Sequence, residues 1–292
     1  MNTKKKKNKR KVSTDLYNNN KKLVVVSRVV TILFSLTIIY PIIFIVLVSF
    51  KNNQEFYSNI WGLPEVFRWS NYEYAWKEGN IGKYASNSMI VTLTAVIGSV
   101  VFSAPSGYAL SKLGIPKSKT IMSVLLALNF IPNVAVFIPL YTQLIKMHLN
   151  KTLYMLIFPN LVWQIPFSIY IFKNFFDSIP SALIEAARID GSSEFTIFFR
   201  VIMPNVRPAF ATVMVFNFIN IWGEYIWASV AASSTTSIQT IPVGLLYFRG
   251  EYGIQWGPFA AAIVVIVIPL LIVFIYLQKY FIQGLTAGAV KG

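Results

Sequence analysis

The apolar residues of this chain gather in long stretches that are apolar on every side, instead of forming one stripe per helix or alternating along strands. A stretch of about 20 apolar residues can cross a bilayer as a helix. Six stretches qualify, and they cover residues 29–50, 85–111, 120–145, 152–172, 208–229 and 252–278, of which only 208–229 holds a charge, Glu224. Transmembrane β-strands alternate polar and apolar residues over about 10 positions. The sequence therefore predicts an all-α integral membrane protein with six transmembrane helices.

Lysine and arginine are unevenly shared between the segments that separate these stretches. With the N-terminus inside, 19 of the 26 basic residues fall in the inner segments 1–28, 112–119, 173–207 and 279–292. Because basic residues are retained on the cytoplasmic side, both termini are expected in the cytoplasm. The basic cluster Lys4–Lys11 is expected to fix this orientation and to attract anionic membrane lipid, rather than to bind nucleic acid.

Composition agrees with a membrane protein that carries no chemistry of its own. Of the 292 residues, 55% are hydrophobic and 13% charged, whereas soluble domains hold about 25% charged residues. There is no cysteine and one histidine, His148, so disulfides, iron–sulfur clusters and histidine-rich metal sites are excluded. The sequence also has no P-loop for ATP. We expect a non-catalytic protein without a cofactor or a metal, with His148 in a solvated loop.

The inner segment 173–207 is the part of the chain that does not fit a bilayer. Pro180 suits the first turn of a helix over residues 181–190, and Gly191 suits a left-handed end to it. Ser192 or Ser193 can cap a second helix, Glu194 to Met203, which Pro204 would stop. From composition, two interpretations stay open: a handle for a cytoplasmic partner, or an amphipathic helix at the headgroup level.

These residues carry a resemblance. Glu185-Ala186-Ala187, Asp190-Gly191 and Ile202-Met203-Pro204 resemble the EAA motif of permease subunits in ABC importers, with Met203 where leucine is usual. Three further stretches are similar to the maltose-type carbohydrate permeases: residues 107–112, residues 222–225, where Gly223 replaces the usual asparagine, and the tail from Gly284 to Gly292. The resemblance runs from about residue 25 to the end of the chain.

The resemblance implies a multi-pass subunit of a bacterial-type cell membrane that forms half of a translocation path for a carbohydrate, such as an oligosaccharide. Its partners would be a second homologous permease, two ATP-binding subunits that hydrolyse ATP, and an extracytoplasmic solute-binding protein. The coupling helix between the fourth and fifth spans would contact the ATPase through Glu185, Ala186, Ala187, Arg188, Asp190, Gly191 and Pro204. Ala287, Gly288, Val290 and Lys291 of the tail would also reach the ATPase, or else form a solvated end.

The expected organisation is a basic cytoplasmic tail over residues 1–28, a permease domain over 29–282 with its coupling segment 173–207, and a cytoplasmic tail over 283–292. Glu224, with Asn220 and Trp222, is a candidate for lining the solute path. Alternatively, Glu224 pairs with Arg249 or Lys83 in a structural role.

Two other functions stay open. One is import of sn-glycerol 3-phosphate or another small solute. The other is an ATPase-independent secondary transporter, which would place ionisable residues at the membrane midplane.

Overall fold

The computed structural model describes the backbone of residues 2–233, 235–250 and 253–289, and the side chains of residues 23–233, 235–250 and 253–279. Four of its helices have a stretch long and apolar enough to cross a membrane: Leu23–Val48, Ile81–Lys112, Tyr154–Asp177 and Trp256–Lys279. They belong to α1 (Asn2–Val48), α4 (Ile81–Lys112), α7 (Tyr154–Asp177) and α14 (Trp256–Ala289). Two bent helix pairs raise the number to six if each pair is one span.

The first bend falls inside the predicted span over residues 120–145, and the second falls between the predicted helix over 194–203 and the predicted span over 208–229. The first separates α5 (Ser118–Ala127) and the short η1 (Leu128–Phe130) from α6 (Asn133–Lys146), at an angle of 89°. Pro132 follows the break, and Ile131 before it is extended, with ψ 119, because proline disfavours a helical residue ahead of it. The span predicted over residues 120–145 is therefore broken into two helices, and it counts as one span only if the bent pair is taken together.

The second bend, of 79°, lies at Val206. Before it run α9 (Glu194–Thr196), the π-helix η2 (Ile197–Ile202) and α10 (Met203–Asn205), and after it runs α11 (Arg207–Trp222). Pro204 was expected to stop this helix but lies in the first turn of α10, where its missing donor costs nothing. The π-helix ahead of it shifts the hydrogen-bond register, which is how such bulges accommodate a change of direction.

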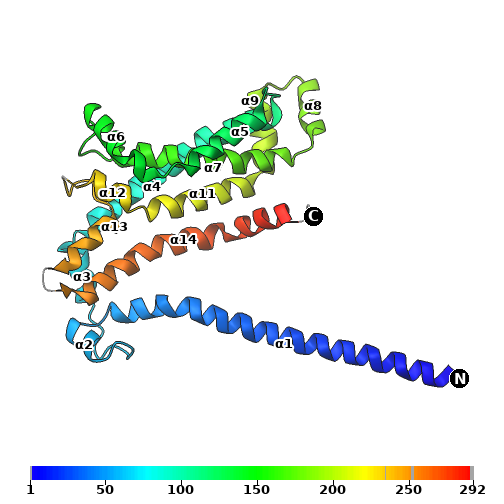
Figure 1. Cartoon of the computed structure of the whole chain (residues 1–292), viewed down its shortest axis with the longest axis horizontal. Helices are drawn as coiled ribbons and strands as arrows, with labels where there is room; N and C mark the ends of the chain where they lie inside the picture. Colours follow the sequence, from blue (N-terminus) through cyan, green and yellow to red (C-terminus); the bar gives the residue numbers. More distant parts are fainter. Residues whose placement is uncertain (1, 234, 251–252, 290–292) are drawn as a thin grey trace.

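The remaining elements are short. They are α2 (Asn53–Ser58), α3 (Ser70–Lys77), α8 (Ser181–Ile189), α12 (Ile226–Ala231), α13 (Ile241–Gly244), η3 (Leu245–Phe248), β1 (Arg249–Gly250) and β2 (Gly253–Ile254). The two strands pair antiparallel, Arg249 opposite Ile254. Elements α2, α3, α6, α12 and α13 gather at one side of the molecule, and α8 and α9 lie at the other (Figure 1). His148, at the exposed turn after α6, lies in a solvated loop as predicted.

The bundle proper consists of α4, α7, α11 and α14. The most extensive contact joins α4 and α7, and Gly107 makes it possible: a Cβ there would lie 2.8 Å from the Cβ of Phe172. Its apolar core has two parts. One surrounds Trp227 and Leu156 on the side of α12, and the other surrounds Phe172 and Phe176 on the side of α8.

A small polar network ties the middle of the bundle together. The side-chain amide of Asn217 in α11 donates to the hydroxyl of Ser99 in α4 at 2.7 Å and to that of Ser168 in α7 at 3.0 Å. All three residues are buried. Because a polar group in an apolar interior is costly unless it is hydrogen-bonded, these bonds fix how the three helices face each other.

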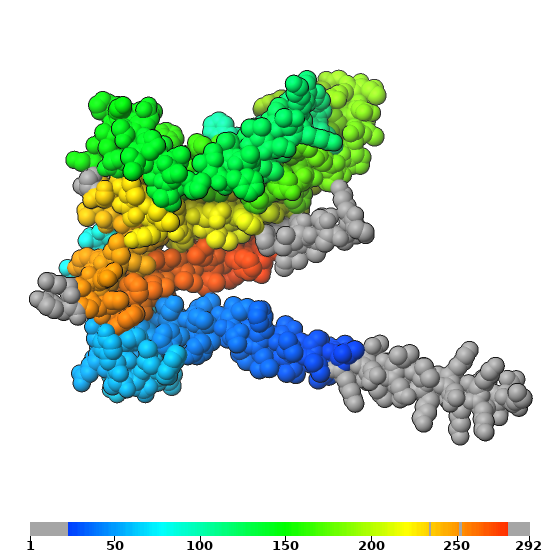
Figure 2. All heavy atoms as spheres, in the orientation of Figure 1, coloured from blue at the N-terminus to red at the C-terminus, as the bar shows by residue number. Residues whose placement is uncertain are grey.

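Helix α1 stands apart from this bundle. Every residue from 23 to 43 is exposed. Among the described side chains, the helix joins the rest through its last turns, where Val48 packs near Phe56 and Ala260 and the rings of Tyr40 and Phe44 lie against Trp61. Its hydroxyls bond to its own backbone, as Thr31 does to the Ser27 carbonyl at 2.8 Å. In the space-filling view, the described parts of α1 and α14 diverge away from that joint (Figure 2).

Candidate functional site

The predicted coupling helix is present as α8, with both ends built as its sequence suggests. Pro180 precedes the first residue, and Asp190 ends the helix. Gly191 has a φ of +78°, a left-handed conformation that favours glycine. The amide of Gly191 donates to the Arg188 carbonyl at 3.0 Å, and that of Ser192 donates to the Ala187 carbonyl at 3.0 Å. This pair of bonds is the Schellman arrangement, which satisfies carbonyls that a helix end would leave free.

Helix α8 is held to the bundle by one side. Ile184 is 2% exposed and belongs to the core part around Phe172 and Phe176. Ala187 is half-buried, whereas Glu185, Ala186, Arg188 and Asp190 are exposed. The helix thus exposes most of its predicted motif, while Ile184 and Ala187 pack against the bundle.

An ion pair braces the turn after α8 and reaches back to α4. Arg188 Nε donates to Glu194 Oε1 at 2.6 Å, and the Tyr108 hydroxyl donates to Glu194 Oε2 at 2.8 Å. Tyr108 is buried against Phe176 and Phe198. The sequence offered no signal for this contact, because Glu194 and Tyr108 lie 86 positions apart and only the fold brings them together. One carboxylate therefore links the coupling segment to the end of a long bundle helix.

A second set of bonds joins the same two regions. Lys112 Nζ, at the end of α4, donates to the Ile179 carbonyl ahead of α8 at 2.6 Å. The Ser111 hydroxyl donates to the Asp177 carboxylate at 2.5 Å, which also receives Lys173 Nζ at 2.7 Å. These bonds reach the chain ahead of α8, and the bond from Tyr108 to Glu194 reaches the chain after it. The end of α4 is thus bonded to the chain on both sides of α8.

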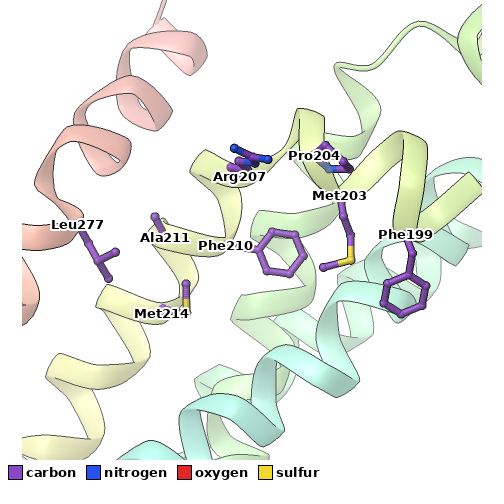
Figure 3. Close-up of a pocket in the computed structure, with 8 residues that line it drawn as sticks. All are labelled: Phe199, Met203, Pro204, Arg207, Phe210, Ala211, Met214 and Leu277. Atoms are coloured by element: carbon purple, nitrogen blue, oxygen red, sulfur yellow. The ribbon is translucent and has the colours of Figure 1, made fainter.

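Pro204 lies away from the exposed face of α8. It lines an apolar hollow of about 470 Å³ between the α10–α11 bend and α14, in which Leu277 of α14 faces Ala211 and Met214 of α11 (Figure 3). Arg207 is the one charged residue of this lining. The bend at Val206 therefore borders open space on one side, unlike the tightly packed contact of α4 with α7.

A larger hollow, of about 820 Å³, lies on the other half of the molecule, between the α5–α6 break, α7 and α11. The face of the molecule is notched where α5 and α6 diverge (Figure 2). Its polar lining consists of Asn129, Asn133, Asn160, Gln164, Asn220 and Glu224, and its aromatic lining of Phe130, Phe137, Trp163, Phe167 and Phe216. Of these, sequence analysis singled out only Asn220 and Glu224. The rest come from η1, α6, α7 and α11, and the face that these elements share could not be known before the break at Pro132 was seen.

The three residues predicted for the solute path separate in the structure. Asn220 and Glu224 line this larger hollow, which we call the outer hollow because it lies on the side of α6 and α12, opposite α8 (Figure 1). Trp222 does not: it is 2% exposed, and its indole donates to the Ile266 carbonyl of α14 at 3.0 Å. Its place is therefore between α11 and α14.

Glu224 has a structural task besides lining the hollow. One carboxylate oxygen accepts from the Trp227 amide at 2.6 Å and the other from the Ala228 amide at 2.9 Å. These are orphan donors of the first turn of α12, which a carboxylate suits. The expected ion pair with Arg249 or Lys83 is absent among the described side chains, and α12 takes its place.

Part of the predicted ATPase contact cannot be placed. Val290 and Lys291 lie outside the described residues, and only the backbone of Ala287 and Gly288 is described.

Comparison with known proteins agrees with this arrangement. Residues 99–287 match the family model described as the binding-protein-dependent transport system inner membrane component. The diacetylchitobiose uptake system permease NgcG of Streptomyces coelicolor is 32% identical over 94% of this chain and 91% of its own length. The melibiose/raffinose/stachyose import permease MelC of Bacillus subtilis is 31% identical over 81% of this chain and 86% of its own length.

A solved structure is similar over nearly the whole chain. It is a bacterial ABC transporter involved in the import of the acidic polysaccharide alginate, with a TM-score of 0.73, 26% identity, and coverage of 90% of this chain and 98% of that one. The predicted resemblance to carbohydrate permeases of ABC importers is thereby confirmed.

Proposed function

Because the chain belongs to the family of binding-protein-dependent transport system inner membrane components, we propose that it is the permease subunit of an ATP-driven importer and that its solute is a carbohydrate. The observation that carries this proposal is α8, a short rigid helix with an exposed motif, anchored by Ile184 and braced to α4 through Glu194. The carbohydrate class is supported by the named sugars of the relatives NgcG and MelC.

ATP hydrolysis takes place in separate subunits, two per transporter, and a second homologous permease completes the path. The separation of α1 from its own bundle supports the presence of a second permease, because that partner can pack on the exposed surface of α1. A solute-binding protein docks on the side of α2, α3 and α12, opposite α8. The six spans run with both ends of the chain in the cytoplasm, on the same side as α8.

In this mechanism the ATPase moves α8, and α8 moves the bundle. Closure of the ATP-binding subunits draws α8 together with its counterpart in the second permease. The displacement passes through Ile184, Glu194 and Lys112 into α4 and α7, whose close packing at Gly107 makes them move as one body. The outer hollow then opens toward the binding protein. The family's dependence on a binding protein favours this scheme over an ATPase-independent transporter.

Site-specific crosslinking tests the coupling role, and the chain has no cysteine of its own to interfere. Ala186→Cys, on the exposed face of α8, is expected to crosslink to the co-expressed ATP-binding subunit in native membranes. The matched control is Ser58→Cys, which is also exposed but lies in α2 at the other side, and it should give no such product. Equal crosslinking from both positions, or none from Ala186→Cys, would contradict the proposal.

A further inference from the structure

The lining of the outer hollow is rich in amide side chains although the helices that form it are apolar. Asn160 and Gln164 lie in the first half of α7, and Asn220 lies near the end of α11, both within apolar helices. With Asn129 and Asn133 from the α5–α6 break, five amide side chains border one space. Hydrocarbon offers no hydrogen-bond partners to such groups. This face therefore meets water and solute rather than lipid.

Charge on the same lining is nearly absent. None of the residues that border the hollow in the described part of the chain is lysine, arginine or histidine. The one carboxylate, Glu224, has both oxygens engaged by the amides of Trp227 and Ala228. A desolvated charge needs a counter-charge or several strong hydrogen bonds. This lining supplies no cation for an anionic solute, and its anion is already occupied.

Two of the amides form a pair that leaves one donor and one acceptor toward the hollow. Asn220 Nδ2 donates to Gln164 Oε1 at 3.4 Å, joining α11 to α7. Each amide has a second functional end: the Gln164 amino group donates, and the Asn220 carbonyl oxygen accepts. A neighbouring donor and acceptor match a hydroxyl group, which both accepts and donates.

An aromatic ring next to this pair is held in a fixed orientation. Trp163 is half-buried, with its ring 5.8 Å from that of Phe137 and 6.0 Å from that of Trp227. Trp227 is itself locked by its indole, which donates to the Met155 carbonyl at 3.0 Å. The part of Trp163 that these rings leave uncovered borders the hollow. A flat apolar surface beside hydroxyl-binding amides complements a sugar ring, which has an apolar face and a hydroxylated rim.

From these features we infer that this subunit contacts the transported solute directly and that the solute is an uncharged oligosaccharide, bound by the Gln164–Asn220 pair and stacked on Trp163. The inference rests on the proposed import function and narrows it. It separates this chain from importers of acidic glycans and of sn-glycerol 3-phosphate. Glu224 positions α12 and does not bind the solute.

The test uses the complete importer, with both permeases, the ATP-binding subunits and the binding protein, in proteoliposomes that contain ATP. Uptake of diacetylchitobiose and raffinose is compared with uptake of alginate oligosaccharides and sn-glycerol 3-phosphate. ATP-driven uptake is expected only for uncharged sugars. In Gln164→Leu and Trp163→Ala, uptake of the accepted sugar should fall about tenfold, as loss of a hydrogen bond or a stacked face implies, and Trp163→Phe should restore part of it.

The matched control is Gln143→Leu, the same change at an exposed position of α6 that does not border the hollow, and it should leave uptake unchanged. Assembly of the complex and stimulation of ATPase by the binding protein are measured for every variant. If Gln164→Leu impairs assembly, Asn220→Gln repeats the test, because it keeps the amide and displaces it by about one methylene.

The outcomes separate the inference from the function beneath it. Unchanged sugar uptake in Gln164→Leu and Trp163→Ala would overturn direct binding by this subunit, and preferential uptake of an acidic solute would overturn the uncharged class. Both results leave an ATP-driven importer in place. ATP-independent uptake with no bound ATPase would instead overturn the proposed function, and with it the inference.

Discussion

At the scale of single residues, Gly191 and Gly107 both require glycine, but for opposite structural reasons. Gly191 has no atom within 4 Å of where a Cβ would be, so its backbone conformation alone demands glycine. Gly107 is the reverse case, because a Cβ there would meet the backbone of α7. The sequence allowed the first to be predicted from its place after a helix. The second needed knowledge of which helix lies against it.

The left-handed conformation of Gly191 can be tested with a matched pair. Gly191→Val forces a branched side chain into a left-handed conformation, which costs about 1–2 kcal/mol, whereas Gly191→Asn tolerates it. We expect Gly191→Val to lower binding-protein-stimulated ATPase activity by up to about tenfold and Gly191→Asn to lower it little. Neither should alter the amount of subunit in the membrane, since nothing near Gly191 is packed. Equal activity in both variants would argue against a role for this turn.

Tyr108 offers a second test, of the link between α4 and the coupling segment. Tyr108→Phe removes the hydroxyl that Glu194 accepts and keeps the ring between Phe176 and Phe198. A hydrogen bond to a charged group contributes about 1.5–3 kcal/mol. Stimulated ATPase activity should fall while the unfolding temperature changes by only a few degrees. Tyr84→Phe, at the other end of α4, is the control and should keep full stimulation.

At the scale of elements, sequence reasoning succeeded where an apolar stretch forms one helix and failed where it forms two. Helices α4, α7 and α14 coincide with predicted stretches, because their prolines, such as Pro105 and Pro166, leave them continuous. Pro132 instead follows an extended residue and ends a helix. Stretches with a proline inside a helix and the stretch that breaks at Pro132 are similarly apolar. Hydropathy therefore could not predict the break, nor the outer hollow that the break creates.

The segment between α1 and α4 provides a prediction about pH. Glu55 is buried and accepts hydrogen bonds from the Glu65 amide and from Arg68, with which it forms an ion pair. Burial alone would raise the pKa of the Glu55 carboxyl group, but the Glu65 hydrogen bond and the Arg68 ion pair outweigh it, and the pKa falls below its usual value of 4.5.

A carboxyl group whose pKa is lowered by folding stabilises the folded state above 4.5, and that contribution is lost as the pH falls through the lowered value. The unfolding temperature of the purified complex should therefore drop as the pH falls below the usual pKa of this carboxyl group, 4.5, and Glu55→Gln should flatten this part of the profile. Glu78→Gln, at an exposed acid nearby, should leave it unchanged. A Glu55→Gln profile as steep as that of the parent protein would contradict the assignment.

At the scale of the whole molecule, the structure places the outer hollow and α8 at opposite sides of one continuous bundle, with the hollow on the side of α6 and α12 (Figure 1). The polar network of Asn217, Ser99 and Ser168 joins α11 to α4 and α7, the helices that run between these two sides. Under the proposed mechanism, motion imposed at α8 would reach the hollow through α4, α7 and α11, the helices that this network holds together.

The separation of α1 predicts a contact with the second permease. Ser35→Cys lies in the exposed part of α1, and its side chain bonds only to its own helix, at the Thr31 carbonyl. In membranes that contain both permeases, this cysteine should form a crosslink to the second permease. Membranes that lack the second permease serve as the control. Absence of the product in both would show that lipid alone surrounds α1.

The free stretch of α1 also bears on how cells keep subunit numbers matched. In the proposed importer, a copy made without the second permease would expose the apolar residues 23–43 of α1, which are not covered by the rest of the described chain. Such an unassembled subunit would be a substrate for membrane quality-control proteases, and docking of the second permease would cover α1. Degradation of surplus copies would then set the ratio of the two permeases without any dedicated regulator.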